Sequence, residues 1–136
     1  MLTVAWAQPQ QPPQPPQHAA AEKPDARRIS AVELKKVLAS RRKVFLLDVR
    51  EPKELEEEGA IKGAINIPLG TLAERLAEVP KGVRLVSICR RAHRAGRAAD
   101  LLEKNGYSGI RTFAMNDWRE KGYNLEHPKA PPVNKK

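Results

Sequence analysis

"VRLVSICRRAHRAGRAADLLEKNG", residues 83–106, joins a short β-prone run, a single cysteine, a basic loop and a helical stretch. The run over residues 83–88 is continuously β-prone, as in a strand buried on both faces, and it leads straight into Cys89. Helical spacing follows over residues 94–106, where Gly106 is the natural helix stop. A strand, a loop and a returning helix form the repeating unit of a parallel α/β sheet.

The segments on either side continue this alternation. Ser30 and Glu33 form a capping box that opens a helix over residues 31–40, and residues 43–49 predict another buried strand. An acidic helix with Pro52 in its first turn should end at Gly59. The other expected elements are a brief extended segment ending at Pro68, a helix at 70–79, a strand at 109–113 and a helix at 116–122 that anchors Trp118. The sequence therefore predicts an α/β fold, with a parallel sheet and helices on both faces.

A chain of 136 residues is long enough for a single domain, which we place at residues 29–127. Residues 1–28 are rich in Pro and Gln and predict a disordered linker, and residues 128–136 predict a flexible basic tail. Ala5-Trp6-Ala7 has the small-x-small spacing of a signal-peptidase site. We favour the remnant of an export signal and a periplasmic or otherwise exported protein; the alternative is an ordinary disordered start in a cytoplasmic protein. No segment of the sequence is expected to span a membrane.

The positive charge of the chain is concentrated near the cysteine. The formal net charge is +9, but residues 29–127 hold 19 basic and 14 acidic residues, an excess of five. Between Lys81 and Arg97 there are six basic residues and no acidic one, which accounts for that excess. Such a focused field favours a small anionic substrate. Aromatic residues make up only 4% of the chain, which does not favour a nucleic-acid surface.

Cys89 is the only cysteine, which excludes an intrachain disulfide and a multi-thiolate metal site. The three histidines have no ligand-like spacing, so we expect no metal and no cofactor. Cys89 lies at the carboxyl end of a predicted strand and before a helix N-terminus, where α/β sheets place their sites. Backbone N–H groups, the helix dipole and nearby arginines would favour the thiolate. The alternative is an inert buried thiol beside helix-surface charges.

Two motifs together resemble the rhodanese-like (sulfurtransferase) domain family of the single-domain type. "LLDVREPKELEEEGAIKGAINIPL", residues 46–69, is similar to the family's Asp-Val-Arg strand end and the segment that follows it. "CRRAHRAGRAADLLEKNGY", residues 89–107, resembles its active-site loop and helix. The resemblance covers residues 29–125 and implies a rhodanese-like parallel sheet.

The resemblance also implies roles for the loop. Cys89 would be the nucleophile that forms a persulfide, and the backbone amides of residues 90–94 would hold negative charge. Arg94 would bind substrate oxygens or fix the shape of the loop. Arg90 and Arg91 would tune the choice of substrate electrostatically.

Three further residues have less direct implied roles. Asp48 and Arg50 would support the site, mainly structurally, with Arg50 near it. His93 would be either a proton donor or a partly exposed loop imidazole.

The resemblance implies that the length of the loop favours sulfur transfer over phosphate chemistry. The spacing from Cys89 to Arg94 is C-x4-R, whereas the related phosphatases and arsenate reductases have C-x5-R, which accommodates a tetrahedral oxyanion. We therefore expect a sulfurtransferase that moves a sulfane sulfur from thiosulfate or a persulfide donor to a thiol or cyanide. A protein persulfide could be a partner, and we expect a monomer. The alternatives are a non-catalytic anion- or protein-binding module and, less favoured, a phosphatase or arsenate reductase.

The sequence departs from the family pattern at three places. Ala92 stands where the family often has glycine, so a positive φ there would carry a cost. Ala60 stands where histidine is frequent. The glycine pair that usually precedes Trp118 is absent, and we expect Met115 and Asn116 to reshape the entrance of the site.

Overall fold

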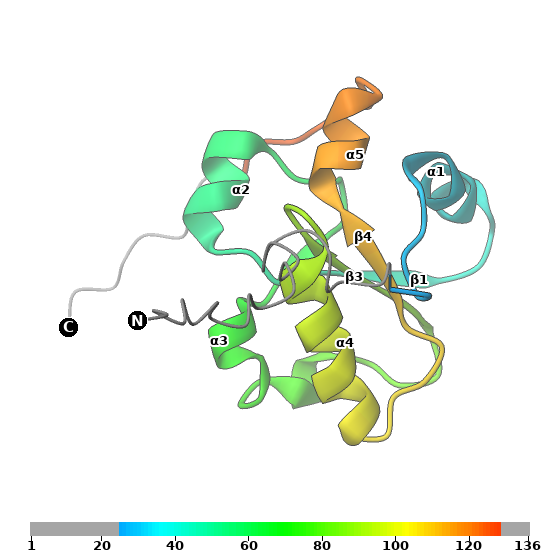
Figure 1. The fold of residues 1–136 in the computed structure, drawn as a ribbon, viewed down its shortest axis with the longest axis vertical. Coiled ribbons are helices and arrows are strands. Elements are labelled where there is room, and N and C mark those ends of the chain that lie inside the picture. The colour runs from blue at the N-terminus through cyan, green and yellow to red at the C-terminus, as the bar shows by residue number, and fades with distance from the viewer. Residues whose placement is uncertain (1–24, 129–136) are drawn as a thin grey trace, which may run out of the picture.

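The computed structural model describes residues 25–128, which form a parallel sheet of four strands in the order β2-β1-β3-β4 (Figure 1). The strands are β1 Val44–Asp48, β2 Ile65–Asn66, β3 Arg84–Cys89 and β4 Arg111–Ala114. The predicted signal remnant and most of the predicted linker (up to residue 24), and the tail from residue 129, lie outside the described residues. The predicted α/β class with a parallel sheet is confirmed.

Helices cover both faces of the sheet, as the sequence predicted. They are α1 Ala31–Ala39, α2 Pro52–Glu58, α3 Leu69–Leu72, α4 His93–Lys104 and α5 Met115–Glu120, with a 3-10 turn at Leu76–Glu78. Figure 1 shows α3 and α4 on one side of the sheet, and α1 and α5 on the other. The central strands β1 and β3 are therefore mostly buried, which explains their continuous apolar runs, whereas Ile65 of the edge strand β2 is exposed.

Alternate residues of the strands feed two separate cores. On β3, Leu85 and Cys89 face α4, where they pack with Leu102. Val86 and Ile88 face the other way. That second core also holds the side chains of Leu34, Phe113 and Trp118. The period of two along β3 thus fixes the side on which the Cys89 thiol lies.

Helix ends follow the local sequence signals. The backbone N–H of Glu33 donates to Ser30 Oγ at 3.1 Å, and Ser30 N–H donates to Glu33 Oε1 at 3.4 Å, which completes the predicted capping box. Gly59 ends α2 with a φ of +87°. A Cβ at Gly59 would lie 3.0 Å from Leu125 Cβ, so both conformation and space require glycine there.

The predicted helix over residues 70–79 is wrong in its extent, because it forms only α3 and the separate 3-10 turn. Pro80 has no N–H to donate to the carbonyl of Leu76, and it favours an extended Val79, observed at φ −98° and ψ 115°. The Tyr107 hydroxyl lies 3.0 Å from Leu76 O and 2.7 Å from Val79 O. A side chain distant in sequence therefore caps the carbonyls that a longer helix would have used.

The sheet is extended at its β4 edge by residues just before the expected domain start. Thr112 N–H donates to Arg27 O at 3.0 Å, and Ile29 N–H donates to Thr112 O at 3.0 Å. The Arg27 side chain forms ion pairs with Asp25, Asp100 and Glu103 at 2.7–3.0 Å.

Among residues 25–128, no helix has the length and apolar content that a membrane crossing requires.

Candidate active site

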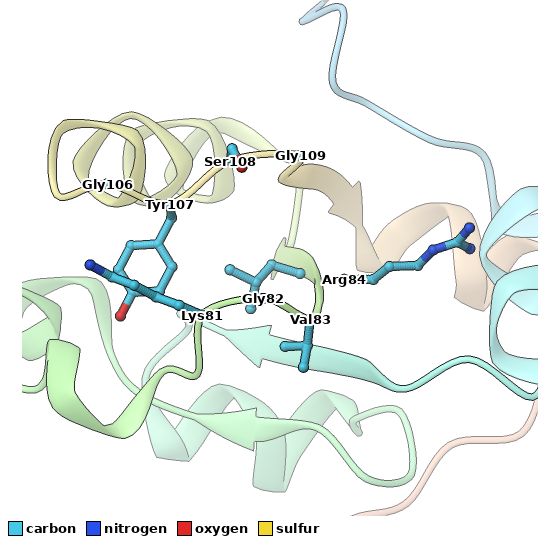
Figure 2. Close-up of a pocket in the computed structure, with 9 residues that line it drawn as sticks. Lys81, Gly82, Val83, Arg84, Gly106, Tyr107, Ser108 and Gly109 are labelled. Carbon is cyan, nitrogen blue, oxygen red and sulfur yellow. The ribbon is translucent and has the colours of Figure 1, made fainter.

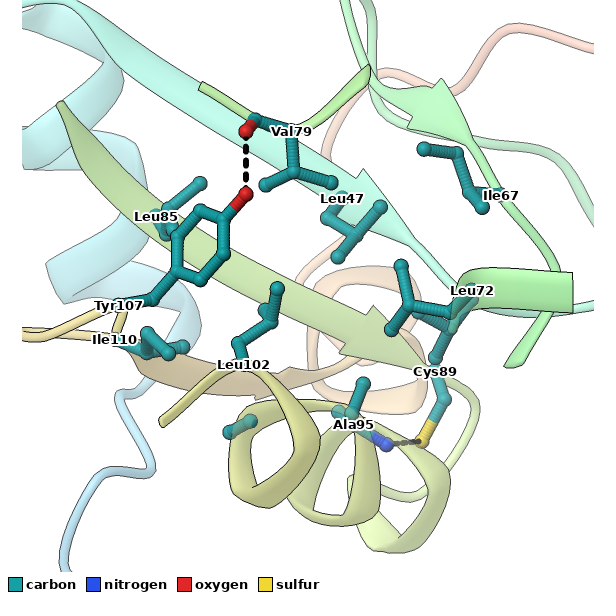
Figure 3. Close-up of a cluster of buried hydrophobic side chains, with 13 residues drawn as sticks. Leu47, Ile67, Leu72, Val79, Leu85, Cys89, Ala95, Leu102, Tyr107 and Ile110 are labelled. Carbon is teal, nitrogen blue, oxygen red and sulfur yellow. Dashed lines mark hydrogen bonds between the residues drawn. The ribbon is translucent and has the colours of Figure 1, made fainter. Parts of the chain in front are cut away.

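Cys89 lies at the carboxyl end of β3, where the chain turns into the first residues of α4. The side chain is buried, with only 1% of its surface exposed. Its Sγ accepts a hydrogen bond from the backbone N–H of Ala95 at 3.2 Å, drawn as a dashed line in Figure 3. An N–H donor in the first turn of a helix stabilises negative charge on the sulfur. The predicted placement of Cys89 before a helix N-terminus is confirmed.

Ala92 makes this turn possible at a cost in backbone strain. It is the N-cap of α4 and has a φ of +73°, the left-handed region that favours glycine. Among residues 25–128 it is the only non-glycine residue with a positive φ. Because Ala92 O accepts the N–H of Gly96 at 2.9 Å, α4 begins directly after this residue. The positive φ that would penalise alanine at position 92 is therefore present.

Arg94 forms a two-point ion pair with a glutamate of α2. Its Nη1 and Nη2 each lie 2.7 Å from an oxygen of Glu54. Hydrogen bonding to Arg94 lowers the pKa of Glu54 to about 2, against the opposing effect of burial. The Glu54 contact raises the pKa of Arg94, and negative charge on Cys89 acts in the same direction. The Arg94 guanidinium therefore lies near the thiol but is held by Glu54.

Arg90 is held in the same way one helical turn further along α2. Its Nε lies 3.2 Å from Glu58 Oε2, and its Nη2 forms a second close contact with the same carboxylate. The backbone carbonyl of Arg90 accepts the N–H of Asn116 at 3.1 Å. Arg90, the first residue of the loop, is thus held by its side chain to α2 and by its main-chain carbonyl to α5.

Asp48 and Arg50 form a fully buried ion pair beneath the loop. Arg50 Nε and Nη2 donate to the two oxygens of Asp48 at 2.9 and 2.7 Å. Arg50 Nη2 also donates to Gly59 O at 2.9 Å, and Nη1 lies 3.8 Å from Glu58 Oε2. Both side chains have an exposed fraction of 0%, so neither can bind a substrate directly in this conformation.

Arg91 and His93 lie exposed at the rim of the loop. Within the described part of the chain, Arg91 forms no ion pair, and the backbone N–H groups of Arg91 and Ala92 donate to no other group. These two amides and the Arg91 side chain are available to a bound anion. The predicted site residues 90–94 therefore follow Cys89 around the start of α4. The side chains of Arg90 and Arg94 already bind glutamates, so fewer donors remain for a substrate than the sequence predicted.

The sequence reasoning missed Glu54 and Glu58. The two glutamates are four residues apart on α2, and the arginines that they bind, Arg90 and Arg94, are also four residues apart. This equal spacing of acidic and basic residues could have suggested the two ion pairs. It could not show that α2 packs against the loop after Cys89. The positive field expected around Cys89 is consequently reduced by two carboxylates.

The departures from the family pattern have separate outcomes. Ala60 is buried, and its backbone pairs with that of Glu126 at 2.6 and 2.8 Å. Met115 is 1% exposed in the core with Phe113 and Trp118, so the expectation that it reshapes an entrance is wrong. Met115 is the first residue of α5, and with Trp118 it is one of the two buried residues of that helix. Asn116 contacts the loop, but through its main chain.

The pocket in Figure 2 lies at the opposite end of β3 from Cys89. Its volume is about 310 Å³, and Lys81 Nζ lies over the Tyr107 ring, 5.0 Å from the centroid. Arg84 extends away from Lys81 in this view. No cysteine or histidine lines the pocket. Within residues 25–128 no group of three His, Cys, Asp or Glu side chains is arranged to hold a metal ion.

A family model described as the rhodanese-like domain matches residues 30–121. An uncharacterized Bacillus subtilis protein, YqhL, is 46% identical over 72 residues, which cover 53% of this chain and 56% of that protein, so the match spans just over half its length. The human thiosulfate:glutathione sulfurtransferase is 36% identical over 109 residues, covering 68% of this chain and 93% of that one. The crystal structure of a rhodanese-related protein from Thermoplasma volcanium is similar at a TM-score of 0.67 and 30% identity, covering 75% of this chain and 99% of that one.

Proposed function

This chain belongs to the rhodanese-like domain family, and we propose that it is a sulfurtransferase that carries a sulfane sulfur on Cys89. The observation that carries the proposal is the Ala95 N–H directed at Cys89 Sγ, at the end of β3 and the start of α4. The similarity to sulfurtransferases supports the reaction class. The residues of the site supply the chemistry.

In the first half-reaction the Cys89 thiolate attacks the outer sulfur of the donor. With thiosulfate, the bond between the two sulfur atoms of the donor breaks, sulfite leaves with the electron pair, and an ionised Cys89 persulfide remains. The available amides of Arg91 and Ala92 and the N-terminus of α4 stabilise that negative charge. The covalent intermediate splits the transfer into two steps.

In the second half-reaction an acceptor thiolate attacks the outer sulfur of the Cys89 persulfide. The persulfide bond breaks, the acceptor becomes a persulfide and the Cys89 thiolate is restored. Cyanide would take the same sulfur and leave as thiocyanate. No external oxidant or reductant is required in either step.

A non-catalytic binding module is the second candidate, and the burial of Cys89 favours it. Only 1% of the residue is exposed, and Arg90 and Arg94 are both held by α2. In that case the available loop amides would bind an anion or a peptide carboxylate without covalent chemistry. The two candidates differ in whether Cys89 ever carries sulfur.

Mass spectrometry of the intact protein separates them. The protein is incubated with thiosulfate, and separately with a hydropersulfide, and its mass is measured before and after treatment with excess thiol. We expect a gain of one sulfur atom that the thiol removes, and no gain in Cys89→Ser. If neither donor adds sulfur to a folded protein, the sulfurtransferase proposal is wrong and the binding module takes its place.

A further inference from the structure

Two glutamates of α2 bind Arg90, in the loop after Cys89, and Arg94, in the first turn of α4. Glu54 binds Arg94 through two contacts of 2.7 Å, and Glu58 binds Arg90. The glutamates lie four residues apart, one turn of α2, and the arginines also lie four residues apart, one in the loop and one in the first turn of α4. The two ion pairs therefore join the same two segments, α2 and the chain from Arg90 to Arg94.

The pairs are partly buried and connected to the core. The exposed fraction of the side chain is 22% for Glu54 and 18% for Glu58. Glu58 lies 3.8 Å from Arg50, which is itself bound to Asp48. Charges therefore alternate in sign from the core to the loop. The arginine side chains are more exposed, 33% for Arg94 and 43% for Arg90, so salt screens these pairs less than fully exposed pairs but still weakens them.

This arrangement changes what the site attracts. A free arginine beside the thiol would stabilise a doubly charged donor, whereas an arginine bound to a carboxylate offers little net charge. The carboxylates themselves repel an anion that approaches the same loop. Arg91 remains as the exposed loop arginine without an ion pair in the described structure. The charge balance suits a donor with one negative charge or none.

We infer that Glu54 and Glu58 set the donor specificity of the Cys89 site, favouring small hydropersulfides of low charge over the thiosulfate dianion. This inference rests on the proposed sulfurtransferase function and deepens it. The two glutamates are positioning residues that act through Arg94 and Arg90. In the favoured reaction the Cys89 thiolate attacks the outer sulfur of RS–SH, the S–S bond breaks, and RS⁻ leaves. Cys89 keeps the transferred SH group.

The test compares two donors on the same protein. Single-turnover rates of sulfur loading on Cys89 are measured by mass spectrometry with thiosulfate and with the hydropersulfide of 2-mercaptoethanol. In Glu54→Gln/Glu58→Gln, the ratio of the thiosulfate rate to the hydropersulfide rate should rise about tenfold or more, because two arginines become available to the dianion. The thiosulfate rate of this variant should also fall more steeply with salt.

The matched control is Glu56→Gln/Glu57→Gln, which removes the same charge from exposed positions of the same helix. Its donor ratio should remain within about twofold of the wild-type ratio, because exposed charges are screened. Glu58→Gln alone leaves Glu54 in place as the cap of α2, and it should move the ratio in the same direction. A change in folding alone would alter both rates without altering their ratio.

Three outcomes are distinguishable. A raised ratio in the Glu54 and Glu58 variants, absent from the control, supports the inference. An unchanged ratio, or an equal rise in the control, overturns it while sulfur loading of the wild type still supports the proposed function. Absence of loading from either donor on the folded wild type overturns the proposed function and this inference with it.

Discussion

Ala92 carries the most unusual backbone conformation of the described chain. Its φ of +73° places an alanine where glycine has no steric penalty. The strain is retained because this residue lets the chain leave β3 and enter α4 within a few residues of Cys89. In energetic terms, the site is built at the expense of local stability.

Replacing Ala92 by glycine tests this directly. Ala92→Gly should raise the free energy of unfolding by about 0.5–1 kcal/mol, because relief of the left-handed strain exceeds the added entropy of glycine in the unfolded chain. Urea unfolding followed by tryptophan fluorescence measures the change. Ala98→Gly, inside α4, should instead lower the stability. A lower unfolding midpoint for Ala92→Gly would show that the conformation is not strained.

At the scale of elements, α2 joins helix capping to the positioning of the loop. Glu54 Oε2 accepts the N–H of Glu51 at 2.8 Å and therefore caps α2 at its start. The same carboxylate binds Arg94 at the start of α4. The N-termini of two helices thus depend on one ionised side chain.

This dependence predicts how stability changes with pH. The pKa of Glu54 is lowered in the folded protein to about 2 from an ordinary 4.5, so its contribution is present above pH 4.5 and is lost as the pH falls toward 2. Near neutral pH, Glu54→Gln should cost about 1–3 kcal/mol of unfolding free energy. Urea unfolding between pH 6 and 2 should show the variant and wild-type stabilities converging on acidification.

The exposed Glu57 on the same helix supplies the comparison for that experiment. Glu57→Gln should keep the steepness of the wild-type pH profile, since its carboxylate forms only a long, exposed contact with Lys53 at 3.8 Å. A constant stability gap between wild type and Glu54→Gln down to pH 2 would contradict the assigned coupling.

At the scale of the whole molecule, one sheet separates two apolar cores. Ile110 belongs to the core beneath α4, and Ile61 belongs to the core on the side of α1 and α5. Both cores contain side chains of β1 and β3, so folding of each requires the same sheet. We therefore expect a single cooperative unfolding transition.

Conservative truncations in the two cores test this organisation. Ile110→Val and Ile61→Val should each cost about 0.5–1.5 kcal/mol, since each removes one buried methyl group. The double variant should match the sum within about 0.5 kcal/mol, because the sites lie on opposite faces and share no partners. Urea unfolding monitored by circular dichroism and by fluorescence should give coincident transitions. Separate transitions for the two probes would show that the cores unfold independently.

Local chemistry explains why so much of this fold could be predicted. The capping box at Ser30, the Pro52 start and the Gly59 end of α2 depend on neighbouring residues, so the sequence indicated them correctly. Pro80 also acts locally, by ending helical structure before it. The prediction of one helix over residues 70–79 gave more weight to the helical spacing of the apolar residues than to this proline. Met115 was expected at the entrance of the site but is buried. It directly follows β4, and the end of β4 is set by pairing with β3, which the local sequence does not show.

The sequence by itself determined the alternation of strands and helices, the placement of Cys89 at the end of a strand and the concentration of basic residues behind it. Only the tertiary structure decided what those basic residues do. Arg90 and Glu58 are 32 residues apart and Arg94 and Glu54 are 40 apart, so no local pattern pairs them. The order β2-β1-β3-β4 brings α2 against the loop, and close approach across the fold converts an apparent positive patch into two ion pairs.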